Sequence, residues 1–158
     1  MSRRVRMEGE LGRLPTLPAG TSVELVTPDG DLWRYHCVGT TAPLIALSLG
    51  WGAQNVWLRE VERQFMLAKR PDVFSDLALA IAQVLQHPVS VHANPRGRSD
   101  DEYFLADGQA LRAAGVLRSR TKLVDLAIGR RAGAGGSYLR AYHFAPTNRN
   151  KGGRQLWP

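Results

Sequence analysis

The hydrophobic and polar positions change their period along the chain, and the first pattern is that of strands. Residues 21–27 alternate polar and apolar side chains, residues 28–31 (Pro-Asp-Gly-Asp) have turn chemistry, and residues 32–38 are rich in strand-forming side chains. This pattern predicts a β-hairpin. Residues 1–20 have a basic start followed by prolines and glycine, and we expect a flexible lead-in there.

The middle of the chain has helical spacing. Apolar side chains in residues 56–70 fall on one helical face, and Pro71 ends this run because the residue before a proline is pushed out of the helical region. A second apolar stripe occupies residues 73–86, where Asp72 is placed to cap it and His87-Pro88 to stop it. The sequence therefore predicts two consecutive helices.

After Pro88 the pattern returns to strands. Two alternating runs are separated by a Gly/Ala connector over residues 130–137 and should pair antiparallel. Residues 102–115 fit either a strand or a helical turn. The predicted strands are residues 89–91, 122–128 and 138–144. A polar loop is expected at residues 94–101, after the first of them.

Together these elements predict an α+β fold, in which two consecutive helices pack on a small antiparallel sheet that follows an N-terminal β-hairpin. We expect four segments along the chain. They are a flexible lead-in (1–20), an N-terminal β unit (21–51), an α+β domain (52–146) and a basic tail (147–158).

Composition narrows the class of protein. The chain has 158 residues, of which 44% are hydrophobic, and a formal net charge of +7, so we expect a globular protein. The lone Cys37 excludes an internal disulfide framework. No apolar run is long enough to span a bilayer and no secretory leader is recognisable, so we expect a cytoplasmic protein without a membrane partner.

The positive charge is concentrated late in the chain. Residues 118–158 contain nine basic residues and one acid, Asp125. A positive field of this kind favours a polyanionic partner such as nucleic acid, although a solvated basic surface without a specific partner is the simpler alternative. The four histidines lack metal-ligand spacing and there is no phosphate-binding P-loop, so we expect neither a metal nor a cofactor.

The last predicted strand has an arrangement suited to RNA. Strict alternation places Arg140, Tyr142 and Phe144 on one face, where aromatic rings could stack on bases and the guanidinium could neutralise phosphate. In the alternative, Tyr138 and Phe144 belong to the core and Arg140 extends to solvent. His143 points to the other face unless a bulge turns it, which favours a structural role.

The order of elements from about residue 54 to 146 resembles the phage-encoded and toxin-associated branch of the barnase–EndoU–colicin–RelE-like ribonuclease superfamily. The segments that carry the resemblance are Asn55-Val56-Trp57-Leu58, residues 68–73, residues 82–88, the basic loop at residues 96–98, and the closing strands 122–128 and 138–146. Where that family has Arg-His-Pro at the end of the first helix, this chain has Lys69-Arg70-Pro71.

The resemblance implies a toxin-like, metal-independent endoribonuclease that cleaves tRNA or mRNA by attack of the 2′-hydroxyl on the adjacent phosphate. It also implies an acidic antitoxin or immunity protein as a partner. Lys69 or His143 would transfer protons and Tyr142 would orient the substrate. Arg98 and Arg140 would stabilise the phosphate. The RNA backbone would be bound by Arg70, Arg118, Arg120, Lys122 and Arg131.

Two other functions remain open from the sequence. The basic C-terminal sheet could serve a non-catalytic nucleic-acid-binding module, or a protein-interaction module that binds an acidic partner. Both nucleic-acid functions depend on one premise, that the late arginines converge on a single surface.

Overall fold

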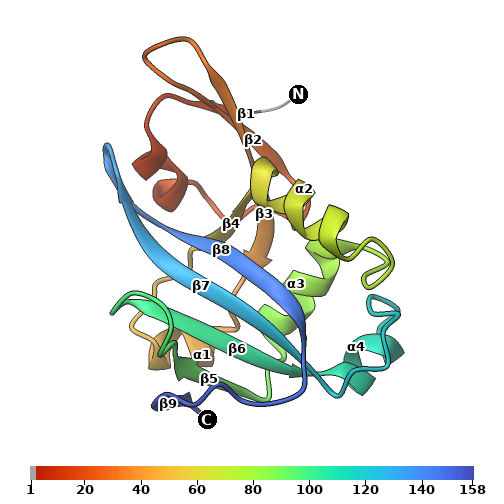
Figure 1. Cartoon of the computed structure of the whole chain (residues 1–158). Coiled ribbons are helices and arrows are strands. Elements are labelled where there is room, and N and C mark those ends of the chain that lie inside the picture. Colours follow the sequence, from red (N-terminus) through yellow and green to blue (C-terminus); the bar gives the residue numbers. More distant parts are fainter. Residues whose placement is uncertain (1–2) are drawn as a thin grey trace.

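A computed structural model describes residues 3–158, which form one continuous sheet of nine strands (Figure 1). The strand order is β1-β2-β3-β4-β8-β7-β6-β5-β9, and the pairs β1–β2 and β4–β8 are parallel while the others are antiparallel. The strands are β1 (Arg3–Val5), β2 (Ser22–Val26), β3 (Leu32–Thr40), β4 (Asn55–Arg59), β5 (Ser90–Ala93), β6 (Asp101–Asp107), β7 (Leu123–Gly133), β8 (Gly136–Thr147) and β9 (Gln155–Trp157).

The helices are short. One is a 3₁₀ helix, η1 (Glu8–Arg13), and the others are α1 (Pro43–Ser48), α2 (Glu60–Lys69), α3 (Leu77–Gln86) and α4 (Gly108–Ala113). No helix within residues 3–158 is long and apolar enough to cross a membrane.

The predicted fold class is wrong: residues 3–158 form a large mixed sheet with five short helices, not two helices on a small antiparallel sheet. Part of the error lies in residues 56–59, which were expected to begin a helix and instead belong to β4. The first four side chains of β4 are all buried, because the strand lies in mid-sheet with both faces covered. Such a strand has no alternation that would distinguish it from a buried helix.

Both predicted helices are present with later starts. The first begins after β4, as α2, and has no buried residue. The second, α3, is capped by Asp76 rather than Asp72, because the Asp76 carboxylate accepts the backbone N–H of Leu79 at 3.1 Å. The start of α3 is therefore set by Asp76, the one of the two nearby aspartates whose carboxylate accepts a backbone N–H of the first helical turn.

The predicted hairpins are confirmed, and the second is longer than expected. Strands β2 and β3 pair antiparallel, and so do β7 and β8. Strands β7 and β8 remain paired through most of residues 130–137, which were expected to be the connector. The tight turn that joins them is confined to the four residues from Gly133 to Gly136. The ambiguous residues 102–115 contain both alternatives, β6 followed by α4, and the C-terminal residues 155–157 add β9 to the sheet beside β5.

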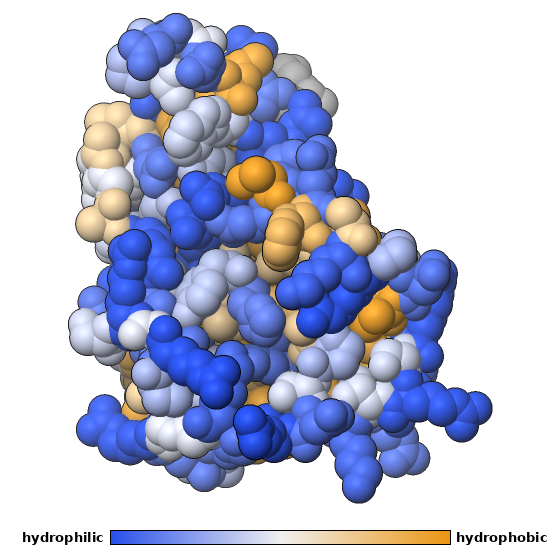
Figure 2. Space-filling view, viewed as in Figure 1, coloured by the Kyte–Doolittle hydropathy of each residue, from blue (hydrophilic) through white to orange (hydrophobic). Residues whose placement is uncertain are grey.

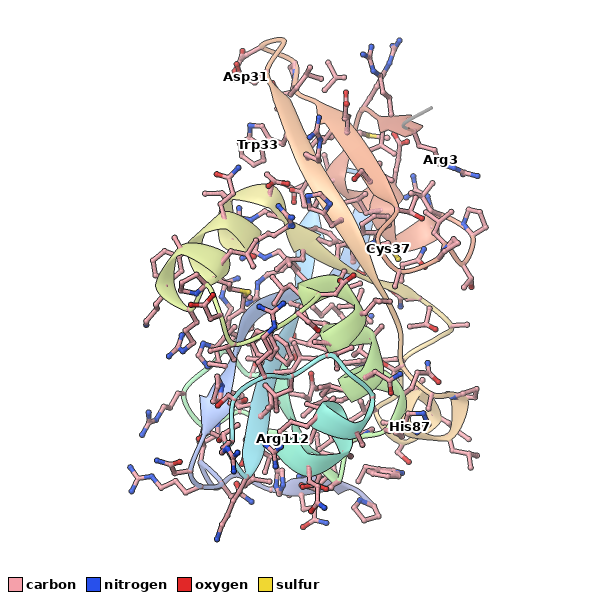
Figure 3. All side chains as sticks on the ribbon, turned by 90° about the vertical axis from the view of Figure 1, so that its right-hand side faces the viewer. Arg3, Asp31, Trp33, Cys37, His87 and Arg112 are labelled. Atoms are coloured by element: carbon pink, nitrogen blue, oxygen red, sulfur yellow. The ribbon has the colours of Figure 1, made fainter. Side chains whose placement is uncertain are left out.

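The two faces of the sheet are covered differently. The larger core lies between the sheet and helices α1, α3 and α4, and Figure 3 shows α3 and α4 in front of the strands on this face. On the other face, η1 and its flanking residues cover a smaller core that includes Leu11, Trp57 and Tyr138. The Trp57 indole N–H donates to the Leu11 carbonyl oxygen at 3.1 Å. Residues 3–17, expected to be a loose lead-in, thus contribute a strand and a packed 3₁₀ helix.

The close approach of η1 to the β7–β8 turn makes Gly9 sensitive to substitution. The Gly9 N–H donates to the Ala134 carbonyl oxygen at 2.8 Å, and a Cβ atom on Gly9 would overlap the backbone of Gly135 and Gly136. We expect Gly9→Ala to lower the free energy of unfolding by roughly 1–3 kcal/mol, as overpacking does. Urea unfolding measures this, with Gly52→Ala as the control because a Cβ atom there meets nothing within 4 Å. Equal stability of the two variants would contradict the packing described.

Candidate functional site

The order of side chains along β8 is interrupted by a bulge. His143 lies opposite Ala127 and Ala141 lies opposite Ile128, so Tyr142 has no partner residue in β7. A bulge of this kind turns two successive side chains toward the same face of a sheet. Tyr142 and His143 therefore both project away from the larger core.

The bulge corrects the predicted faces of this strand. His143 shares a face with Arg140, whereas Phe144 enters the larger core and stacks on Phe74, with ring centroids 4.5 Å apart. The prediction that Phe144 lies beside Arg140 and that His143 lies opposite them is wrong. The alternative that Phe144 and Tyr138 are core residues is confirmed, since both are almost fully buried.

His143 lies at the centre of a charged cluster. Its Nε2 is 3.8 Å from Oδ2 of Asp125, and the same oxygen is 2.6 Å from the Lys151 ammonium. The Asp125 side chain is 2% exposed, whereas that of His143 is 44% exposed. Lys69 and Arg70, at the C-terminal end of α2, lie close enough for their charges to act on the imidazole. These five residues are called the His143 cluster below.

The cluster keeps the imidazole neutral. Burial lowers the pKa of His143 below its usual value, and the charges of Lys151, Arg70 and Lys69 lower it further, against an opposing effect of Asp125. A histidine with a lowered pKa is unprotonated at neutral pH and can accept a proton. Nε2 is 3.8 Å from the Asp125 carboxylate, beyond hydrogen-bond distance, but the negative charge on that side favours a proton on Nε2 and leaves Nδ1 as the acceptor.

The segment that carries Lys151 is fixed to the sheet. The Tyr103 hydroxyl contacts Asn150 Oδ1 and the Gly152 carbonyl oxygen, and the Lys151 ammonium lies 5.4 Å from the centre of the Tyr103 ring. His92 stacks on the Tyr103 ring, with the two ring centroids 5.0 Å apart. Because β9 then pairs with β5, the cation is held in place from both sides.

A second polar group, the Asp101 network, surrounds the buried carboxylate of Asp101. Arg131 Nη1 donates to Oδ1 at 2.8 Å, and the Tyr142 hydroxyl donates to Oδ2 at 2.8 Å. The Asn94 amide donates in turn to the Tyr142 oxygen at 2.9 Å, and the Arg98 backbone N–H also reaches Oδ2. Every side chain of this network is engaged within it, so its geometry indicates a structural role.

The structure divides the predicted site residues among several places. Lys69, Arg70 and His143 come together in the His143 cluster, whereas Tyr142 and Arg131 belong to the Asp101 network. Arg140 lies 3.7 Å from Glu62, which Arg59 also contacts. Arg131 and Arg140 of the β7–β8 hairpin therefore face carboxylates rather than solvent.

The remaining predicted cations lie at opposite ends of the sheet. Arg98 is exposed in the loop that precedes β6, whereas Arg118, Arg120 and Lys122 are exposed in the segment that follows α4, beyond the other end of β6. The expected convergence of all late arginines on one surface is therefore wrong. What converges on His143 is a smaller set of three cations, of which only Lys151 comes from the C-terminal region.

Comparison with known proteins gives no family: no family model, no curated protein and no solved structure matches the chain. Within residues 3–158, no group of three or more His, Cys, Asp and Glu side chains is arranged to hold a metal ion. The chemistry of the site is therefore argued from its own residues.

Two residues of the cluster were missed from the sequence. Asp125 carried a signal, because it is the one acid among residues 118–158 and interrupts an otherwise apolar strand. Lys151 carried none, since it lies in a segment that the sequence predicts to be a basic tail. Its place beside Asp125 depends on how the chain returns across the sheet to β5.

We expect Asp101→Asn to destabilise the fold at neutral pH. Burial alone would raise the pKa of Asp101, but hydrogen bonds from Arg131, the Arg98 N–H and Tyr142 outweigh it and hold the pKa below its usual value. This stabilisation is present above about pH 4 and is lost as the pH falls through the lowered pKa. The variant should therefore lose about 3 kcal/mol at pH 7, the cost of breaking a buried ion pair.

Urea unfolding at pH 7 and pH 3 measures this difference. The gap between the wild type and Asp101→Asn should narrow at pH 3, because the carboxylate of the unfolded wild-type chain is then largely protonated and the lowered pKa of the folded state contributes less stability. The exposed Asp100→Asn is the matched control and should cost less than about 0.5 kcal/mol. A gap that is the same at both pH values would show that the charge of Asp101 does not contribute.

The pKa of His143 should respond to Lys151. We expect Lys151→Met to raise this pKa, because the variant removes a positive charge from the cluster and leaves Asp125 to interact with the imidazole. An NMR titration of the histidine ring signals measures the change. Lys122→Met, at an exposed position near α4, should leave the pKa of His143 unchanged. An unchanged value in Lys151→Met would contradict the described cluster.

Proposed function

We propose that this chain is a metal-independent endoribonuclease whose active site is the His143 cluster. The proposal rests on this cluster and no longer on a convergence of the late arginines, which the structure contradicts. The observation that carries the proposal is a half-exposed imidazole 3.8 Å from a fully buried carboxylate, with its pKa lowered by burial and by the charges of three cations. Cleavage of RNA at a phosphodiester needs a proton acceptor, a proton donor and positive charge beside the phosphorus. The cluster contains a group suited to each task.

Each group has a defined step in the proposed reaction. His143 Nδ1 takes the proton of a ribose 2′-hydroxyl while its oxygen bonds to the adjacent phosphorus. The bond from phosphorus to the 5′-oxygen breaks, and that oxygen takes a proton from the Lys69 ammonium. The products are a 2′,3′-cyclic phosphate and a 5′-hydroxyl.

The other members of the cluster act on charge and orientation. The Arg70 guanidinium offsets the negative charge that accumulates on the phosphoryl oxygens in the transition state. Asp125 holds the imidazole in the reactive tautomer and stabilises the imidazolium that forms. Lys151 forms an ion pair with the buried Asp125 carboxylate and contributes to the low pKa of His143.

The resemblance of residues 54–146 to toxin-associated ribonucleases supports the same proposal. The proposed substrate is tRNA or mRNA in the cytoplasm, and the proposed partner is an acidic antitoxin or immunity protein that restrains a protein of net charge +7. Arg70 stands where that family has a histidine, so the proton acceptor of this chain is assigned to β8 instead.

The proposal predicts cleavage of RNA in the presence of EDTA. Purified protein incubated with total tRNA should produce discrete fragments that end in 2′,3′-cyclic phosphate. We expect His143→Ala to lower kcat/KM by roughly 10²- to 10⁴-fold, the usual effect of removing a general base. The exposed His87→Ala is the matched control and should retain full activity.

Thermal melting should show that both histidine variants remain folded, because each replaces a side chain that is at least partly exposed. Binding of RNA without cleavage would replace the enzyme with a non-catalytic RNA-binding module. Cleavage that His143→Ala leaves intact would place the active site elsewhere.

A further inference from the structure

A cavity lies on the helix-covered face of the sheet, where β2 and β3 meet α2 and the start of α3. Its volume is about 440 Å³, and the polar side chains of Ser22, His36 and Arg63 line part of it. His143, by contrast, projects from the opposite face of the sheet. The polar groups of this cavity therefore take no part in the proposed cleavage of RNA.

Three side chains at the cavity form a hydrogen-bonded row. Ser22 and His36 are cross-strand partners in β2 and β3, and the Ser22 hydroxyl lies 3.2 Å from His36 Nδ1. On its other side, His36 Nε2 contacts a carboxylate oxygen of Glu60, the first residue of α2. A serine within hydrogen-bond reach of an imidazole that a third group orients is the arrangement of an activated nucleophile.

The proton positions in this row follow from the charge of Glu60. Burial would raise the pKa of Glu60, but the hydrogen bond and charge of His36 and the charge of Arg63 outweigh it, so that the pKa lies below its usual value. An ionised carboxylate only accepts hydrogen bonds, so the proton of the neutral imidazole is on Nε2. Nδ1 then accepts the O–H of Ser22 and can take its proton.

Helix α2 holds the carboxylate and forms the outer wall of the cavity. The second oxygen of Glu60 accepts hydrogen bonds from Arg63 at 3.0 Å and from Gln64 at 3.2 Å, about one turn further along the helix. Helix α2 has no buried residue, and Figure 2 shows hydrophobic residues at the surface over it. Ser22 and His36 are themselves only partly buried, so a small substrate can reach them from solvent.

The other walls of the cavity are mainly apolar, which suits the acyl part of a substrate. The first turn of α3 also lies here, and the backbone N–H groups of Leu77 and Ala78 are among those that have no acceptor within a helix. Such donors can stabilise the oxyanion that forms when a serine attacks a carbonyl carbon. The apolar lining residues are Val38, Leu58, Leu67, Phe74, Leu77 and Ala78.

The charges around the cavity favour a neutral substrate. Asp76 lines it together with Arg63, and Glu60 contacts both Arg63 and His36. Two carboxylates therefore accompany one arginine, and the like charge disfavours an anionic substrate such as an RNA phosphodiester. An uncharged ester has no such penalty.

We propose that this cavity is an esterase site, in which Ser22 is the nucleophile, His36 is the proton acceptor, and the substrate is a neutral carboxylic ester with a short acyl chain. Ser22 Oγ bonds to the carbonyl carbon while its proton passes to His36 Nδ1. The bond from that carbon to the alcohol oxygen breaks, and this oxygen takes the proton from His36. Water then cleaves the acyl-serine by the same route, which releases a carboxylic acid and restores Ser22. Glu60 is a positioning residue that orients the imidazole.

Covalent labelling of the full chain with an alkyl fluorophosphonate tests the nucleophile, because this reagent reacts with activated serines. Mass spectrometry of the digested protein should find the label on Ser22. His36→Gln should lower the rate of labelling by at least roughly 10²-fold, the effect of losing the general base.

Hydrolysis of p-nitrophenyl butyrate tests turnover. Ser22→Ala should lower kcat/KM by at least roughly 10²-fold, as the loss of a nucleophile does. Glu60→Gln should lower kcat with little change in KM, because it disturbs the imidazole and not the apolar walls that hold the acyl chain.

The matched control is Ser99→Ala, at an exposed loop position, which should be labelled and should hydrolyse the ester as the wild type does. The esterase proposal is overturned if Ser22 of the wild type carries no label, if His36→Gln is labelled as fast as the wild type, or if Ser22→Ala purified in the same way retains the hydrolysis. The site of the label in the wild type does not depend on whether any variant folds. Neither measurement contains RNA, so this proposal and the proposed function can fail separately.

Discussion

The extra residue in β8 determines what each face of the sheet presents. Because Tyr142 has no partner in β7, the strand returns to its alternation one residue out of step, and Phe144 rather than His143 joins the larger core. His143 then lies over Asp125, whose carboxylate would otherwise be buried with the Lys151 ammonium alone. The proposed proton acceptor therefore exists because of a backbone irregularity and not because of an isolated motif.

Burial of charge is the second constraint, and the chain meets it with paired groups. Asp125 and Asp101 are nearly inaccessible to solvent, and each contacts a cation from a distant part of the chain, Lys151 and Arg131 respectively. Removing one partner from such a pair leaves a buried charge uncompensated, which is costly. The two carboxylates differ in their surroundings: Asp101 has its hydrogen bonds satisfied within its network, whereas Oδ1 of Asp125 has no hydrogen-bond partner among the described residues.

Helix α2 carries charged groups that interact with β8 at two places. It leaves the end of β4 beside Arg140, and its last residues lie beside His143, so that one side of the helix borders the proposed active site. Its other apolar side is left open to solvent next to the β2–β3 hairpin.

The sequence alone determined the local elements with strong periodicity. Both hairpins, the two consecutive helices and the excess of late positive charge follow from alternation, spacing and counting, because these features depend on neighbouring residues. The sequence also pointed to Lys69, Arg70 and His143 as members of a site. It could not show that β4 is a central strand, because a strand buried on both faces lacks a period.

Only the tertiary structure decided how these pieces meet. The bulge at Tyr142, the return of residues 150–152 over Tyr103, and the pairing of Arg131 with Asp101 join residues far apart in the chain. A charge count over residues 118–158 predicted one basic surface. In the structure, Arg131 and Arg140 pair with acids, and the exposed cations of the segment before β7 lie far from the loop at the other end of β6. Charge is a property of composition, but the field at a site depends on which carboxylates the fold brings near.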